Sequence, residues 1–197
     1  MGLQADEVIV ACLRRGLLRS SPFLLACSLA LAGPLDAGTR RVVLHARDGG
    51  LTVIGAVTFS PRPDGRVAFS WQVDTAPFTD HFLSMREFKC LPGQGEILCL
   101  VPYPYPHPGH VARDDLAWLE HSLLFMYKKS SEFGAQLWNG VYFRLAVDGN
   151  RLVGTPQAVD LNRISAPPQR TEVPPFGTAH RDDIPPGARW YGRLTIE

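Results

Sequence analysis

The sequence lacks an excess of charge of either sign. Its 197 residues carry 20 Lys and Arg against 19 Asp and Glu, which gives a formal net charge of +1 at pH 7. Such a balance produces no basic surface field that would attract nucleic acid or anionic lipid. We therefore expect no nucleic-acid partner.

Common catalytic motifs are missing as well. The chain has no Gly-x-Ser-x-Gly nucleophile elbow, no phosphate-binding glycine loop, no His-Glu-x-x-His helix and no EF-hand loop. Cysteine is scarce: two of the four lie within the first 37 residues, and joining Cys90 to Cys99 would leave the rest of the chain without a thiol nucleophile. These absences disfavour the common enzyme classes, and we assign no catalytic residue and no cofactor.

Long hydrophobic runs are also absent, but a short one lies near the N-terminus. Residues 23–32 are uncharged and mostly apolar, follow three arginines at positions 14, 15 and 19, and are too few to span a bilayer, which needs about 20. Small-residue cleavage sites of the kind that ends a signal peptide occur at 30–32 and at 35–37. We expect residues 1–37 to be an export leader and the protein to be periplasmic or secreted.

A lipid anchor is the alternative at this end of the chain. Leu24-Leu25-Ala26-Cys27 resembles a bacterial lipobox, in which Cys27 would be acylated and would tie a lipoprotein to the membrane. Only Pro22, Phe23, Leu24 and Leu25 would serve as the hydrophobic core before Cys27, and the apolar run continues beyond Cys27. Simple cleavage is therefore favoured, and membrane association is expected only if Cys27 is lipidated.

Cys90 and Cys99 enclose the segment 91–98, which contains the turn residues Pro92-Gly93 and Gly95. This spacing predicts a β-hairpin closed by a disulfide, as an oxidising compartment would allow. Closing a loop of this length removes about 2–3 kcal/mol of unfolded-chain entropy.

Alternation of apolar and polar residues predicts about eight strands. It is clearest at 66–73, where Val67, Phe69, Trp71 and Val73 share one side. The other predicted strands are 40–47, 51–59, 82–90, 97–101, 141–147, 152–159 and 189–197, and Asp148-Gly149-Asn150 marks a hairpin turn.

One helix is predicted over 114–129. Asp114 suits its N-cap, Lys128 and Lys129 suit its last turn, and an apolar stripe follows the helical period through Leu116, Leu119, Leu123 and Met126. Together these patterns predict a single, mainly β domain over 38–197. We expect an antiparallel meander that forms a small barrel or a strongly curved sheet, with the amphipathic helix packed on it and a proline-rich loop at 162–187.

Candidate sites come from aromatic and histidine residues. Six aromatics with polar groups could line a barrel mouth that holds a small apolar ligand or a partner's side chain: Tyr103, Tyr105, Trp118, Trp138, Tyr142 and Trp190. The pair His107 and His110 could ligate a metal, although a surface turn is the simpler explanation. His180-Arg181-Asp182-Asp183 could supply an acid, a base and an anion clamp, although solvated loop charges explain this cluster too.

Three functions follow from these patterns. The first is an exported, disulfide-stabilised binding protein for an unknown small apolar ligand or protein partner. The second is an envelope interaction protein that docks through the Pro/Tyr segment 102–108. The third is a hydrolase or metal-dependent enzyme that uses His107, His110, His180 and Asp182. Binding is favoured over catalysis because no catalytic motif is present.

Overall fold

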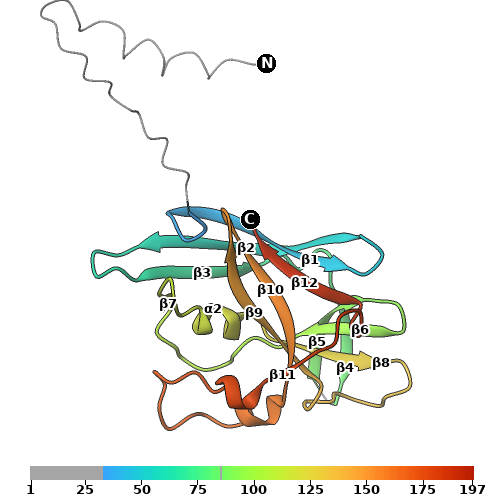
Figure 1. The fold of residues 1–197 in the computed structure, drawn as a ribbon. Coiled ribbons are helices and arrows are strands. Elements are labelled where there is room, and N and C mark those ends of the chain that lie inside the picture. The colour runs from blue at the N-terminus through green and yellow to red at the C-terminus, as the bar shows by residue number, and fades with distance from the viewer. Residues whose placement is uncertain (1–32, 85) are drawn as a thin grey trace, which may run out of the picture. The chain divides into compact units, whose positions relative to one another are not determined.

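The computed structural model describes residues 33–84 and 86–197 and arranges them around one antiparallel sheet (Figure 1). The strands are β1 Gly38–Ala46, β2 Leu51–Pro61, β3 Val67–Val73, β4 Thr79–Leu83, β5 Arg86–Pro92, β6 Glu96–Leu100, β7 His110–Val111, β8 Phe125–Lys129, β9 Gly140–Asp148, β10 Arg151–Val159, β11 Asp182–Asp183 and β12 Tyr191–Ile196. The helical elements are α2 Ala117–Ser122 and the 3-10 turns η1 Leu161–Ile164 and η2 Thr178–His180. The expected leader 1–37 lies mostly, and Cys27 entirely, outside the described residues.

The predicted antiparallel, mainly β class is confirmed, but the small barrel and the count of eight strands are not. The described residues form 12 strands in the order β4-β5-β6-β8-β9-β10-β12-β1-β2-β3-β7, and β11 pairs with β10 beside this path. The path begins at β4 and ends at β7, so the sheet is not closed. Two of the additional strands are the short β7 and β11. The third arises because the predicted strand 82–90 is divided between β4 and β5, and the fourth is β8, which lies within the predicted helix 114–129.

The hairpins predicted from turn residues are present. In the register of β9 and β10, Asp148 lies opposite Arg151 across a turn in which Gly149 has a φ of 62°.

In β2 the register against β1 shifts beside Gly55, whose φ is 147°. A Cβ at Gly55 would lie 2.1 Å from the carbonyl oxygen of Gln72, so only glycine fits at this β-bulge.

The predicted strand 82–90 is instead parts of two strands, β4 and β5. They form a tight hairpin in which Leu83 pairs with Arg86, and Ser84 adopts a φ of 48°. The Ser84 hydroxyl accepts a hydrogen bond of 2.7 Å from the backbone N–H of Ala135, which holds this turn in place. The irregular alternation in this stretch thus reflects a turn that carries no glycine or proline signal.

The predicted helix 114–129 is wrong in its second half. The helix α2 ends at Ser122, and β8 follows, paired with β6 on one side and β9 on the other. Phe125 points into one hydrophobic cluster, whereas Leu124 and Met126 point into another. Successive side chains thus alternate between two apolar faces, and the backbone pairs with a strand on each side. These interactions outweigh the local preference for a helix.

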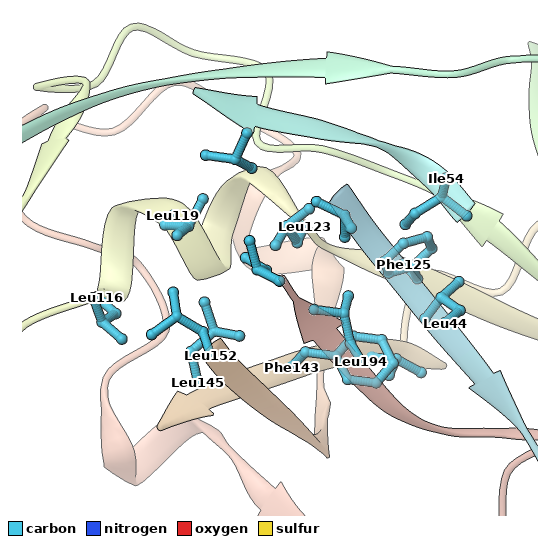
Figure 2. Packing of buried hydrophobic residues seen from close by; sticks show 14 of the residues in the cluster. Leu44, Ile54, Leu116, Leu119, Leu123, Phe125, Phe143, Leu145, Leu152 and Leu194 are labelled. Atoms are coloured by element: carbon cyan, nitrogen blue, oxygen red, sulfur yellow. The ribbon is translucent and has the colours of Figure 1, made fainter. Parts of the chain in front are cut away.

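The first hydrophobic cluster lies on the inner face of the sheet and is closed by α2. Figure 2 shows Leu119 of the helix and the flanking residues Leu116 and Leu123 directed toward side chains of distant strands. Those labelled are Leu44 of β1, Ile54 of β2, Phe125 of β8, Phe143 and Leu145 of β9, Leu152 of β10 and Leu194 of β12. Because strands far apart in the sheet order share this cluster, the sheet must curve around it.

A second cluster covers the opposite face of β5, β6, β8 and β9. Its sheet residues alternate with those of the first cluster and are Phe88, Cys90, Cys99, Met126 and Tyr142. Tyr103 covers them from one side, and Leu161, Ile164 and Phe176 cover them from the proline-rich segment. The middle of the sheet is therefore buried on both faces, which explains the uninterrupted apolar sequence of β6.

The predicted disulfide is confirmed. Cys90 and Cys99 lie directly opposite each other in the β5–β6 register, are bonded, and are fully buried in the second cluster. Their Cα atoms are 3.9 Å apart. The bond therefore joins two strands at the centre of the doubly buried region.

We expect the double substitution Cys90→Ala and Cys99→Ala to lower the free energy of unfolding by about 2–3 kcal/mol, because the unfolded chain regains the entropy of the open loop. Urea unfolding of both proteins measures the difference. Refolding the wild type with a thiol reductant should give the same loss, whereas reductant should leave the double variant unchanged. Equal urea midpoints for wild type and variant would contradict this role.

Candidate functional site

The second cluster brings together most of the aromatic residues singled out in the sequence. Tyr103 contacts Trp118, with ring centroids 5.6 Å apart, and Tyr105, with centroids 5.5 Å apart. Tyr142 belongs to the same cluster and is fully buried. Four of the six predicted residues therefore pack together, although as the covered face of a sheet rather than as a barrel mouth.

The remaining two aromatics lie elsewhere. Trp138 is 63% exposed. Trp190 packs against the first cluster, and its backbone N–H donates a 2.7 Å hydrogen bond to Glu96, which also forms a 2.9 Å ion pair with Arg189. Trp190 thus helps to attach the start of β12 to the disulfide hairpin.

His121 is a buried, neutral residue at the centre of the second cluster. Its Nδ1 lies 2.6 Å from the carbonyl oxygen of Ala117, and its Nε2 lies 3.1 Å from the backbone nitrogen of Phe176. Since a carbonyl can only accept and a backbone N–H can only donate, Nδ1 carries the proton and Nε2 accepts. The ring also stacks on that of Phe176 at 5.4 Å.

Glu120, the preceding residue, is also buried and has three polar partners. One carboxylate oxygen accepts a 2.6 Å hydrogen bond from the backbone N–H of Leu145, and the other accepts from the Tyr142 hydroxyl. The nearest guanidinium nitrogen of Arg181 is 3.9 Å away. Burial raises the pKa of Glu120, opposed by these hydrogen bonds, and burial together with the neighbouring carboxylate raises the pKa of Tyr142.

Glu120 and His121 together attach the proline-rich segment to α2. His121 binds the backbone at Phe176, and Glu120 faces Arg181, whose guanidinium also lies 4.7 Å from the centre of the Tyr142 ring. Two consecutive residues of one short helix therefore hold a segment that has few backbone pairings of its own.

An apolar groove of about 610 Å³ lies between the 100–105 segment, β5 and η1. Its lining includes Tyr103 and Tyr105 and the apolar side chains of Phe88, Leu100, Val101, Leu137, Leu161 and Ile164. The Tyr105 hydroxyl donates a 3.2 Å hydrogen bond to the carbonyl of Ile164, which joins two walls of the groove. The Tyr103 hydroxyl is buried and makes no hydrogen bond with any described residue.

A second, more polar cleft of about 540 Å³ lies between α2, β9 and the 173–181 segment. Glu120, Tyr142 and Arg181 line it, together with Arg144 and Asp115. At the start of α2, Asp115 rather than the predicted Asp114 accepts the backbone N–H of Ala117, at 3.0 Å. The groove and this cleft share no lining residue.

The histidines considered for metal binding or catalysis do not converge. His107 is stacked between Phe69 and Trp118. His107, His110 and His180 line three different hollows, and Asp182 shares that of His180. Nowhere in the described ranges do three or more His, Cys, Asp or Glu residues form a group that could hold a metal ion.

The most constrained polar residues, Glu120 and His121, were not singled out in the sequence analysis. The sequence feature that could have indicated their role is a charged residue next to a titratable one within the mostly apolar segment 116–127. Arg181 was noticed as part of an exposed loop cluster, but its side chain is only 12% exposed, whereas His180 and Asp182 point to solvent. Extended backbone at Arg181 directs its side chain away from those of its neighbours.

Comparison of the chain with protein-family models, curated proteins and solved structures finds no match. The chain is assigned to no family on this basis. Its function must be inferred from the geometry of the groove and the cleft.

We expect His121 to make the protein less stable in mild acid. Burial, together with Arg181 and His107, lowers the pKa of His121 to about 4, and only the Ala117 carbonyl and Asp115 oppose this shift. The unfolded chain therefore binds the proton more readily, and the free energy of unfolding should fall by about 3 kcal/mol as the pH drops from about 6.5 to about 4.

Urea unfolding at pH 7 and pH 4.5 measures this effect. His121→Gln replaces the imidazole with an amide, which also has a hydrogen-bond donor and an acceptor. This variant should lose most of the pH-dependent destabilisation. The matched control His180→Gln alters an exposed histidine and should retain it. An unchanged pH dependence in His121→Gln would show that other groups cause the acid sensitivity.

Proposed function

We propose that this chain is an exported, disulfide-stabilised binding protein that takes a small apolar ligand in the groove beside Tyr103 and Tyr105. The groove's volume of about 610 Å³ is within the range of about 300–1,000 Å³ typical of small-molecule sites. Its apolar lining, drawn from several segments that the fold brings together, is the observation that carries the proposal.

The groove also suggests the chemistry of the ligand. Its apolar wall would exclude water from a hydrocarbon or aromatic body, and each 100 Å² of apolar surface buried there would contribute about 2.5 kcal/mol before the costs of association. Arg86, Glu87 and Lys89 lie at its polar side. Lys89 pairs with both Asp80 and Glu87, so we expect a ligand without a strong net charge.

The two alternatives have less support. In the Pro/Tyr segment 102–108, Pro102, Pro104 and Pro106 are exposed but Tyr103 is buried, which leaves an interaction surface with few aromatic anchors. The enzyme alternative required His107 and His110 to converge with His180 or Asp182, and they line separate hollows. A binding role in the groove agrees best with these positions.

Export is supported by the buried disulfide, which an oxidising compartment favours. No helix within the described residues has the length and apolar character needed to cross a membrane. Leu35 is only 1% exposed and packs in the first cluster. Cleavage after Ala32 would preserve this contact and cleavage after Ala37 would remove it, so we place the leader's end at Ala32.

The groove is tested with the neutral apolar dye N-phenyl-1-naphthylamine, whose fluorescence rises in an apolar environment. We expect saturable binding by the wild type. Leu137→Glu puts a carboxylate into the groove and should weaken the affinity at least 10-fold, because the charge must be desolvated when the dye binds.

Leu51→Glu is the matched control, since Leu51 is exposed on β2 and lies outside the groove. It should bind the dye as the wild type does. Absence of saturable binding, or an equal loss in both variants, would rule out the groove as the ligand site.

The leader is tested by producing the full chain in a bacterium that exports proteins and measuring the intact mass of the exported product. We expect an N-terminus at Gly33 and a mass two hydrogen atoms below that of the same processed chain with both cysteines reduced. An N-terminus at Gly38, or retention of the whole leader in the cytosol, would contradict the proposed processing.

A further inference from the structure

The polar cleft between α2, β9 and the 173–181 segment contains an arginine with few partners. The side chain of Arg181 is 12% exposed, yet it forms no hydrogen bond with any described residue. Its one ion pair, with Glu120, has an N···O distance of 3.9 Å, which is too long for a hydrogen bond. The Nε–H of Arg181 is fully buried without an acceptor, and burying a donor in this way is costly.

A second arginine faces the same cleft. Arg144 follows Tyr142 by two residues on β9, so both side chains lie on the same face of the strand. Arg144 is exposed and forms no ion pair or side-chain hydrogen bond with the rest of the described chain. The cleft therefore offers one exposed and one largely buried guanidinium.

Two of the three acidic residues that line the cleft are already engaged, and the third, Asp114, is exposed to solvent. Glu120 accepts from Leu145 and Tyr142, and Asp115 accepts from the Ala117 backbone N–H. A third arginine, Arg113, faces Asp36 at 3.5 Å. Of the three arginines of the cleft, Arg144 and Arg181 are those without a side-chain hydrogen bond to any described residue, so they are best able to bind an anionic partner.

Apolar side chains border the cleft beside these arginines. Val147 and Val173 are 54% and 42% exposed, and Leu116, Leu145 and Phe176 also line the cavity. A ligand with only a charged group would leave this surface uncovered.

We propose that this cleft is a second binding site, which takes an organic carboxylate with a short apolar tail. The carboxylate accepts hydrogen bonds from Arg144 and Arg181, as planar guanidinium groups favour, and the tail covers Val147 and Val173. The site is separate from the apolar groove and does not depend on its function.

The probe for this site is octanoate, titrated into the mature protein by isothermal calorimetry at pH 7 and low salt. We expect saturable binding, at least 10-fold tighter than that of inorganic phosphate, which lacks the tail. Octyltrimethylammonium, which has the same tail and the opposite charge, should not bind in the cleft. The ¹⁵N resonance of Arg181 Nε should shift when octanoate binds.

Arg144→Gln should weaken octanoate binding at least 10-fold. Arg193→Gln removes another exposed arginine outside the cleft and should leave the affinity unchanged. Leu137→Glu separates the two sites, because it should weaken dye binding in the groove at least 10-fold and preserve octanoate binding here. Equal octanoate affinity in Arg144→Gln and Arg193→Gln, or a loss caused by Leu137→Glu instead, would overturn the proposal.

Discussion

The contacts of Glu120 and His121 with the proline-rich segment are the interactions on which the second half of the structure depends. The strands β5, β6, β8 and β9 are buried on both faces, of which one meets the inner core and the other carries the second cluster, to which α2 contributes Trp118. The other face must be covered, and the covering chain at 161–181 has little regular structure. Attachment of Phe176 and Arg181 to α2 supplies the cover and, at the same time, shapes the polar cleft beside it.

Sequence patterns correctly predicted the strands that have one solvent-exposed face and the hairpins whose turns contain glycine. The strands β1–β3, the β9–β10 hairpin and the disulfide hairpin all follow from period-two alternation, turn residues or cysteine spacing. Patterns failed at β8, which is buried on both faces. Residues 123–127 are all apolar or aromatic, so a helical stripe could be drawn through a strand, and only the neighbouring strands β6 and β9 decide between the two.

The candidate sites were predictable only in part. Tyr103 and Tyr105 were chosen as amphipathic aromatics, and both line the apolar groove. The role of Glu120 could not be predicted from local sequence patterns, because its partners Tyr142, Leu145 and Arg181 lie 22, 25 and 61 residues away in the chain. Contacts of that separation depend on the curvature of the sheet, which local patterns do not specify. The histidine pair His107 and His110 was chosen as a possible metal site, but the two side chains line separate hollows, because each ring is held by neighbours in its own turn or by stacked aromatics.

Backbone hydrogen exchange in Glu120→Ala tests most directly whether α2 holds the covering segment. Amides of 173–181, including that of Phe176, should lose protection relative to the wild type, while amides of β1 and β2 keep theirs. Glu172→Ala, which removes an exposed partner of Arg170, should change neither region. Unchanged protection of 173–181 in Glu120→Ala would contradict the account, as would an equal loss of protection throughout the chain.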